Sequence, residues 1–135
     1  MDRKKLLKRL IYLIFFILIV NFLANKFYWY SAIWWFDMPM HFWGGFWLGL
    51  AYFYVFPSKI FNLRSIVLLL LFVLCIGIGW EVFEIAVNDI LTRNPFDYLD
   101  TFSDIFFDLA GGAGSVLYFF KRIMLQSKNT NGKNS

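Results

Sequence analysis

Four stretches of the chain are apolar around the whole circumference of a helix, and short polar segments separate them. A helix of that kind suits a lipid environment, and about 20 apolar residues are needed to cross a bilayer. The pattern therefore predicts an all-α membrane protein with four transmembrane helices, which form a single domain over residues 1–125. The predicted helices cover approximately 6–24, 38–56, 65–90 and 103–120.

Capping and breaking residues set the predicted boundaries. Asp37 is expected as the N-cap of the second helix, with Pro39 in the first turn, where its missing N–H costs nothing. Pro57 is expected to end that helix, and Thr101 or Ser103 to cap the fourth. After the fourth helix, the Asn- and Lys-rich segment 126–135 is predicted to be a disordered cytoplasmic tail.

The first apolar segment has a second interpretation. Its basic start and short apolar run also fit a secretory signal peptide. However, the small-x-small cleavage pattern is missing, because Phe22 precedes Leu23 and Ala24. We therefore expect an uncleaved helix, followed over 27–36 by an aromatic cluster typical of a membrane–water interface.

Composition supports a membrane protein and argues against nucleic acid as a partner. The hydrophobic fraction is 60% and only 16% of residues are charged. The net charge of +4 arises from basic residues at the termini and in short loops, with no basic recognition helix between them. A single cysteine, Cys75, excludes a disulfide or a cysteine-based zinc site within one chain.

The basic residues predict the orientation in the membrane. With four spans, eleven of the thirteen Lys and Arg residues fall on one side, and only Lys26 and Arg93 fall on the other. The positive-inside rule then places both termini in the cytoplasm. The eleven are Arg3, Lys4, Lys5, Lys8, Arg9, Lys59, Arg64, Lys121, Arg122, Lys128 and Lys133.

The acidic residues segregate the opposite way, towards the extracytoplasmic side. Of the nine, only Asp2 is expected on the cytoplasmic side. Acids contribute little to membrane topology, so this enrichment needs a separate explanation. The other eight are Asp37, Glu81, Glu84, Asp89, Asp97, Asp100, Asp104 and Asp108, and the sole histidine, His41, accompanies them.

Depth and helical spacing predict that these groups converge. At about 1.5 Å per residue, three helices bring ionisable groups to a similar depth in the outer leaflet. Small residues continue the same faces, as at Gly45 and Gly49 after His41, and such faces mark where membrane helices approach closely. The three faces, each carrying small or polar residues, are His41, Gly45 and Gly49; Gly77, Glu81, Glu84 and Asn88; and Asp104, Asp108, Gly111 and Ser115.

Clustered carboxylates with few nearby cations must take up protons or bind a metal ion. One imidazole with several carboxylates suits Mg²⁺, Mn²⁺ or Ca²⁺, and Zn²⁺ if few oxygens bind. An alternative is purely structural, with protonated acids that hydrogen-bond between helices and His41 paired with one of them. The predicted metal ligands are Asp37, His41, Glu81, Glu84, Asp104 and Asp108.

Three short motifs resemble the VanZ-like family of small bacterial membrane proteins. Asp37-x3-His41-Phe42 matches its Asp-x3-His-Phe element, and Glu81-x2-Glu84 its Glu-x2-Gln or Glu-x2-Glu element. Asp104-x3-Asp108-x2-Gly111-Gly112 matches the start of its last helix. Glu84 and Asp108 replace the Gln and Asn of many members, and no clear Arg precedes Asp100; the extra acids make this site more acidic. The resemblance implies a multipass protein of the cell envelope and no particular reaction.

Three functions fit this pattern. The first is a metal-dependent enzyme acting on a lipid or lipid-linked envelope substrate at the outer leaflet, with His41, Glu84 and Asp108 as catalytic residues. The second is a non-enzymatic protein that binds a lipid headgroup, a cation or a glycopeptide antibiotic. The third is proton or cation transport, which is disfavoured because no acid lies in the cytoplasmic half of the helices. The sequence does not determine the oligomeric state.

Overall fold

The computed structural model describes residues 3–56, 62–87, 98–124 and 132–133, and all elements in them are helical. The all-α prediction is confirmed, with four long helices close to the predicted ranges. They are α1 (Arg3–Lys26), α3 (Asp37–Val55), α4 (Leu63–Val87) and α5 (Tyr98–Tyr118). A short helix, α2 (Trp29–Ala32), follows α1, and a π-helical segment, η2 (Phe119–Met124), continues α5.

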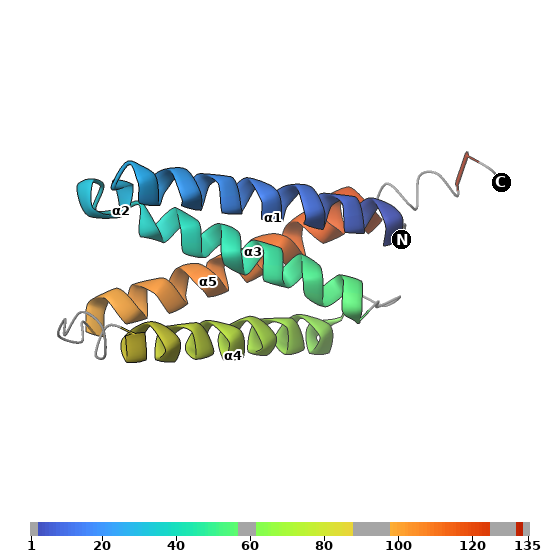
Figure 1. The fold of residues 1–135 in the computed structure, drawn as a ribbon. Coiled ribbons are helices and arrows are strands. Elements are labelled where there is room, and N and C mark those ends of the chain that lie inside the picture. The colour runs from blue at the N-terminus through green and yellow to red at the C-terminus, as the bar shows by residue number, and fades with distance from the viewer. Residues whose placement is uncertain (1–2, 57–61, 88–97, 125–131, 134–135) are drawn as a thin grey trace.

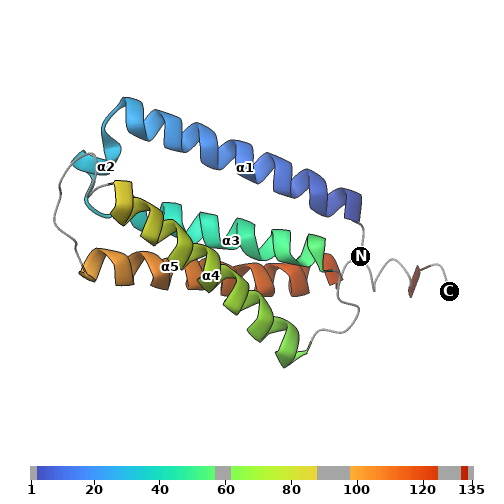
Figure 2. The same ribbon diagram turned by 60° about the horizontal axis from the view of Figure 1, so that its bottom comes forward.

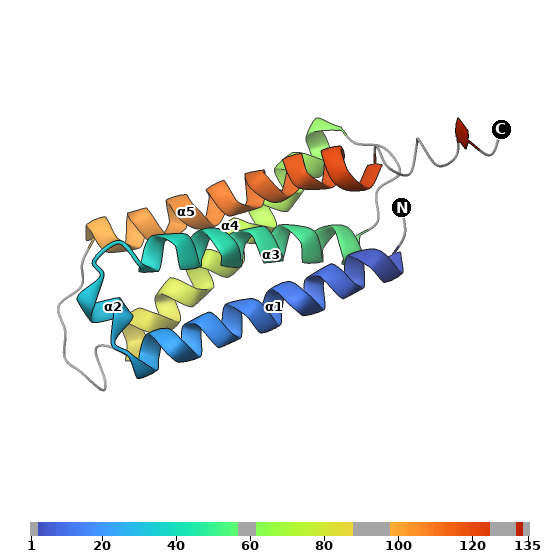
Figure 3. The same ribbon diagram turned by 90° about the horizontal axis from the view of Figure 1, so that it is seen from above.

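The four long helices form one elongated bundle with two distinct ends. The start of α1, the end of α3, the start of α4 and η2 lie at one end (Figure 1). The opposite end holds α2, the starts of α3 and α5, and the end of α4. Helix α3 lies between α1 and α5, while α4 crosses α5 obliquely (Figures 2 and 3).

Within the described residues, two helices are long and apolar enough to cross a membrane. These are α1, with 24 residues, and α4, with 25. At about 1.5 Å per residue, both exceed the roughly 30 Å of a bilayer's hydrocarbon core. Large apolar side chains stay exposed on the outside of the bundle, such as Phe22 (65%) and Val82 (60%). An exterior of this kind is suited to lipid rather than to water.

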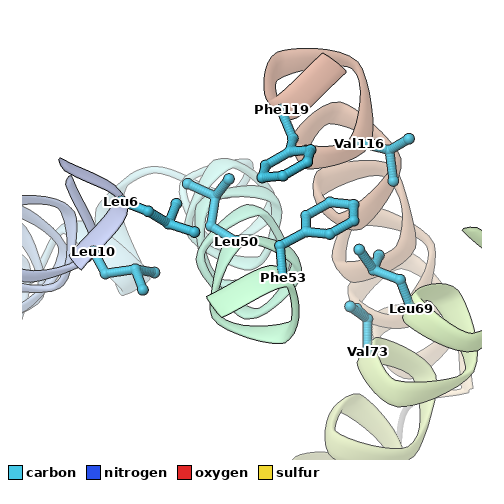
Figure 4. Packing of buried hydrophobic residues seen from close by; sticks show 8 residues of the cluster. All are labelled: Leu6, Leu10, Leu50, Phe53, Leu69, Val73, Val116 and Phe119. Carbon is cyan, nitrogen blue, oxygen red and sulfur yellow. The ribbon is translucent and has the colours of Figure 1, made fainter. Parts of the chain in front are cut away.

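The apolar core lies towards the end of the bundle that holds η2 (Figure 4). The Phe53 and Phe119 rings stack there with centroids 4.0 Å apart and planes 13° from parallel. Side chains from all four long helices surround this pair, and each is at most 6% exposed. The cluster comprises Leu6, Leu10, Leu50, Phe53, Leu69, Val73, Val116 and Phe119.

Glycine lets α3 and α5 make the closest helix contact in the bundle. A Cβ atom added at Gly45 would fall on the backbone carbonyl of Asp108, and one added at Gly111 on that of Phe42. The two backbones are therefore packed directly against each other, which only glycine permits. This crossing lies next to the acidic residues and fixes their positions.

Several predicted boundaries were wrong. Helix α5 begins at Tyr98, so Thr101 and Ser103 lie inside it and cap nothing. Asp100 instead occupies its first turn, where the helix dipole favours a carboxylate. Phe36, and not Asp37, is the N-cap of α3, and no side chain caps this helix start. Asp37 is the first helical residue.

Helix α2 was not predicted. The chain enters it through Tyr28, whose φ of 58° is in the left-handed region. This residue lies between α1 and α2, within the predicted aromatic segment. The predicted breaker Pro57, the helix end at 88–90 and most of the predicted tail 126–135 lie outside the described residues.

Candidate functional site

His41 is the centre of a cluster of carboxylates at the end of the bundle that holds α2. It lies one turn after the start of α3, and its side chain is 9% exposed. The Nδ1 atom lies 3.0 Å from Oδ1 of Asp108 on α5. On the other side of the ring, Nε2 lies 3.5 Å from Oδ2 of Asp37 and 3.5 Å from Oδ2 of Asp104. One imidazole thus faces three carboxylates from two helices.

Helix α4 adds two more carboxylates to this cluster. Glu81 is only 4% exposed. Glu84 is half-buried one turn later, where the indole Nε1–H of Trp80 donates a hydrogen bond of 2.8 Å to its Oε1 atom. The three predicted helix faces therefore do converge, and all six predicted metal ligands lie at one end of the bundle.

Two carboxylate oxygens in the cluster are buried and have no hydrogen-bond partner. They are Oε1 of Glu81 and Oδ2 of Asp104. Asp104 is only 1% exposed, and its Oδ2 atom has the 3.5 Å ionic contact with His41 but accepts no hydrogen bond from the described residues. A buried polar atom without a partner keeps its full desolvation cost, so each such atom in a folded protein needs an explanation. A bound cation or a shared proton would satisfy both oxygens.

Five of the six predicted ligands form two groups that could hold a metal ion. Asp37, His41 and Asp104 offer ligand atoms that all lie within 4.8 Å of one another. Glu81, Glu84 and Asp104 form the second group, and their ligand atoms also lie within 4.8 Å of one another. Asp104 is common to both groups, and it is therefore the central ligand of the candidate site.

Asp108 has a different position from the other acids. It belongs to neither ligand group, and it contacts the Nδ1 side of His41. A Cβ atom at Gly77 of α4 would lie 2.8 Å from its Oδ2 atom, so this glycine leaves room for the carboxylate. Asp108 thus orients the imidazole, as outer carboxylates commonly do for metal-binding histidines.

A pocket of about 970 Å³ opens beside the cluster. His41, Asp37, Asp108 and Glu84 line its polar part, while the buried Glu81 and Asp104 lie outside its lining. Other parts of the wall come from all the helices of the described chain except η2. These residues are Ile14, Asn21, Asn25, Tyr30, Trp34, Met40, Gly44, Trp47, Leu48, Ile76, Gly77, Trp80 and Asp100.

Helices α1 and α2 also contribute to this pocket, which was not predicted from the sequence. Asn21 accepts a hydrogen bond of 2.7 Å from the Tyr30 hydroxyl, which ties α2 to α1. Burial raises the pKa of Tyr30, and the nearby carboxylates of Asp37 and Glu84 raise it further. Asn21 and Asn25 are one turn apart after the apolar run of α1, and this spacing was the feature of the sequence that could have indicated a polar face.

Comparison with known proteins identifies one family. The family model described as "Predicted membrane protein (DUF2238)" matches residues 1–124. No curated protein and no solved structure matches the chain. The comparisons do not tie the chain specifically to the VanZ-like family, and that resemblance stays a prediction from three motifs.

Proposed function

The chain belongs to the DUF2238 family of predicted membrane proteins, and we propose that it binds a divalent cation in its outer-leaflet acidic cluster. Through this cation it acts on a lipid or lipid-linked substrate of the cell envelope. The proposal rests on two buried carboxylate oxygens that accept no hydrogen bond from the described residues, on Glu81 and Asp104, within two groups of metal-ligand geometry.

The proposal includes four spans with both termini in the cytoplasm. Helices α3 and α5 are shorter than α1 and α4, with 19 and 21 residues, and both pack into the same bundle. Basic side chains gather at the end opposite the acids, where Arg3 donates to the carbonyl of Tyr54 and Arg9 lies over the Tyr118 ring. The positive-inside rule assigns that end to the cytoplasm.

The donor set favours a hard cation. Carboxylate oxygens dominate both ligand groups, and such ligands suit Mg²⁺, Mn²⁺ or Ca²⁺; the single imidazole also permits Zn²⁺ with fewer oxygens. Two positive charges would offset part of the repulsion among five neighbouring carboxylates, which is expensive in a membrane interior.

The geometry suggests separate roles for the proposed catalytic residues. A cation between Asp104 and its neighbours would polarise a substrate oxygen. His41, held by Asp108 through Nδ1, presents Nε2 towards Asp37 and Asp104. Glu84 borders the pocket and can exchange a proton with a bound substrate. The VanZ-like resemblance supports an envelope substrate.

A non-enzymatic binding protein is the second candidate. The pocket is large enough for this role, because a volume of about 970 Å³ accommodates a ligand the size of a lipid headgroup with part of its chains. Both the enzyme and the binding protein require the pocket, but only the enzyme converts its ligand into a product.

Metal analysis of the purified protein tests the proposal. Full-length protein in detergent is assayed by elemental mass spectrometry, together with the Asp104→Asn and Glu81→Gln variants. We expect near-stoichiometric divalent metal in the wild type and its loss in both variants. The matched control is Asp100→Asn, which changes an acid of the same helix outside both ligand groups and should keep the metal. A correctly folded wild type that contains no metal and takes up none would overturn the proposal.

A further inference from the structure

The pocket beside the acidic cluster is flanked by two membrane-facing helices. Ile14 and Asn21 of α1 line one side, and Ile76 and Trp80 of α4 line the other. At this end of the bundle α1 and α4 lie on the same side of α3 (Figure 3), and they stand apart from each other (Figure 1). Among the described residues, these two helices meet the length and hydropathy expected of a membrane span.

The lining changes character along the pocket. Ile14, Leu48 and Ile76 lie towards the middle of their helices and present apolar surface. Asp37, Glu84 and the Tyr30 hydroxyl lie near the helix ends at the level of the acidic cluster. A ligand that matches this gradient has an apolar tail and a polar head, and it can enter sideways from the lipid.

The charge of the lining determines which head is favoured. Four carboxylates border the pocket, those of Asp37, Glu84, Asp100 and Asp108, and none of the described residues that line it is a Lys or Arg. Against these four carboxylates the described lining has one imidazole, that of His41, so the lining is acidic. An anionic head would be repelled, whereas a positively charged one would be attracted.

Aromatic side chains strengthen this preference. Trp34, Trp47 and Trp80 line the pocket together with Tyr30. Indole rings attract ammonium groups through their π faces, and aromatic walls of this kind are used to recognise quaternary ammonium ligands. The Trp47 indole is fixed in position by a hydrogen bond of 2.9 Å from its Nε1–H to the carbonyl of Leu10.

We propose that this pocket binds an amphiphile with an ammonium head, which enters from the bilayer between α1 and α4 with its tail along the apolar part of the lining. The proposal deepens the proposed function, on which it rests for the position of the site in the outer leaflet. The bound metal is not required for it, because the pocket carboxylates and indoles make the recognition.

Lipids that share one phosphate and one set of acyl chains test the head preference. Full-length protein in detergent is titrated with phosphatidylethanolamine, phosphatidylcholine and phosphatidylglycerol, and binding is measured by native mass spectrometry. We expect the two ammonium lipids to bind at least about tenfold more tightly than phosphatidylglycerol, which corresponds to about 1.4 kcal/mol. Equal binding, no binding, or a preference for phosphatidylglycerol would overturn the proposal.

A pair of glycine variants tests the location. Gly44 lines the pocket, and a Cβ atom there would meet nothing within 4 Å, so Gly44→Leu starts its side chain in open space and obstructs the pocket. Gly79 has equally open surroundings on α4 and does not line the pocket, which makes Gly79→Leu the matched control. We expect Gly44→Leu to abolish the ammonium preference and Gly79→Leu to keep it. The proposal is wrong if the two variants bind lipids alike.

The same variants separate this proposal from the metal site. Gly44→Leu should keep its metal while losing lipid, and Glu81→Gln should lose its metal while keeping the ammonium preference. A wild-type protein that binds no metal but keeps the ammonium preference would overturn the metal proposal alone. Retained metal without lipid preference would overturn the pocket proposal alone.

Discussion

The Nδ1 atom of His41 lies 3.0 Å from the Oδ1 atom of Asp108, although 67 positions separate the two residues in the sequence. This pair joins α3 to α5 inside the acidic cluster. Replacing His41 with Ala leaves the carboxylates of Asp104 and Asp108 buried without their imidazole partner. We expect the variant to lose about 1–3 kcal/mol of unfolding free energy, measured by thermal unfolding in detergent.

A conservative variant distinguishes the lost contact from a general loss of packing. His41→Asn retains a side-chain amide that can donate to Asp108, so it should recover part of the stability lost in His41→Ala. A His41→Ala variant as stable as the wild type would show that the pair makes no contribution.

Two adjacent glycines on α3 should respond in opposite ways to the same substitution. In Gly45→Ala the new methyl group falls on the carbonyl of Asp108, so α3 and α5 must separate. We expect a loss of about 1–3 kcal/mol, typical of overpacking. Gly44→Ala meets open space and should gain up to about 1 kcal/mol from its higher helix propensity. Thermal unfolding of both variants in one detergent gives the comparison; equal effects would contradict the direct α3–α5 packing.

The stacked phenylalanines provide a test of the core. Phe53→Ala removes a fully buried ring from its contact with Phe119, and we expect a loss of about 3 kcal/mol or more. Phe15→Ala removes the same number of atoms from a side chain that is 59% exposed on α1, and it should change stability by much less. Urea or thermal unfolding in detergent measures both, and similar losses would argue against this core.

Thiol labelling tests the proposed orientation. In a Cys75→Ala background, the variants Lys26→Cys and Lys121→Cys place single thiols at opposite ends of the bundle, at positions that are both exposed. A membrane-impermeant maleimide should label the Lys26→Cys variant in intact cells. It should label the Lys121→Cys variant only after permeabilisation, and the reverse pattern would invert the topology.

Tyr30 should make the protein sensitive to alkaline pH. Its pKa is raised in the folded state, chiefly by burial and then by the carboxylates of Asp37 and Glu84. Its contribution to stability is therefore complete below the unfolded-state pKa of about 10 and is lost as the pH rises above that value. We expect the melting temperature of the wild type to fall more steeply than that of Tyr30→Phe between about pH 9 and pH 11. Parallel pH profiles would contradict this role.

The sequence predicted those features that follow from the spacing of residues along a single helix. The unbroken apolar runs predicted four long helices, and the small-residue spacing of Gly45 and Gly111 predicted which faces meet. The common depth of His41, Glu81 and Asp108 followed from helical rise alone, and the structure brings these residues to the same end of the bundle.

Features that depend on contacts between distant segments were not accessible in the same way. The pocket needs α1 and α4 to stand apart at one end, and no local pattern encodes that separation. Helix α2 follows Tyr28, which has a left-handed backbone conformation. A glycine would have indicated that conformation in the sequence, but the residue is a tyrosine. The early start of α5 was missed because Tyr98 and Leu99 carry no capping signal, and the Ser and Thr that followed were stronger candidates.

The direct backbone contact between α3 and α5 has a consequence for how such a protein can diversify. The acids and the histidine depend on a crossing that tolerates no side chain, so their arrangement is difficult to alter by gradual mutation. The walls contributed by α1 are free of that constraint. Substitutions at Asn21 or Ile14 can therefore reshape the pocket while the arrangement of the acidic cluster stays the same.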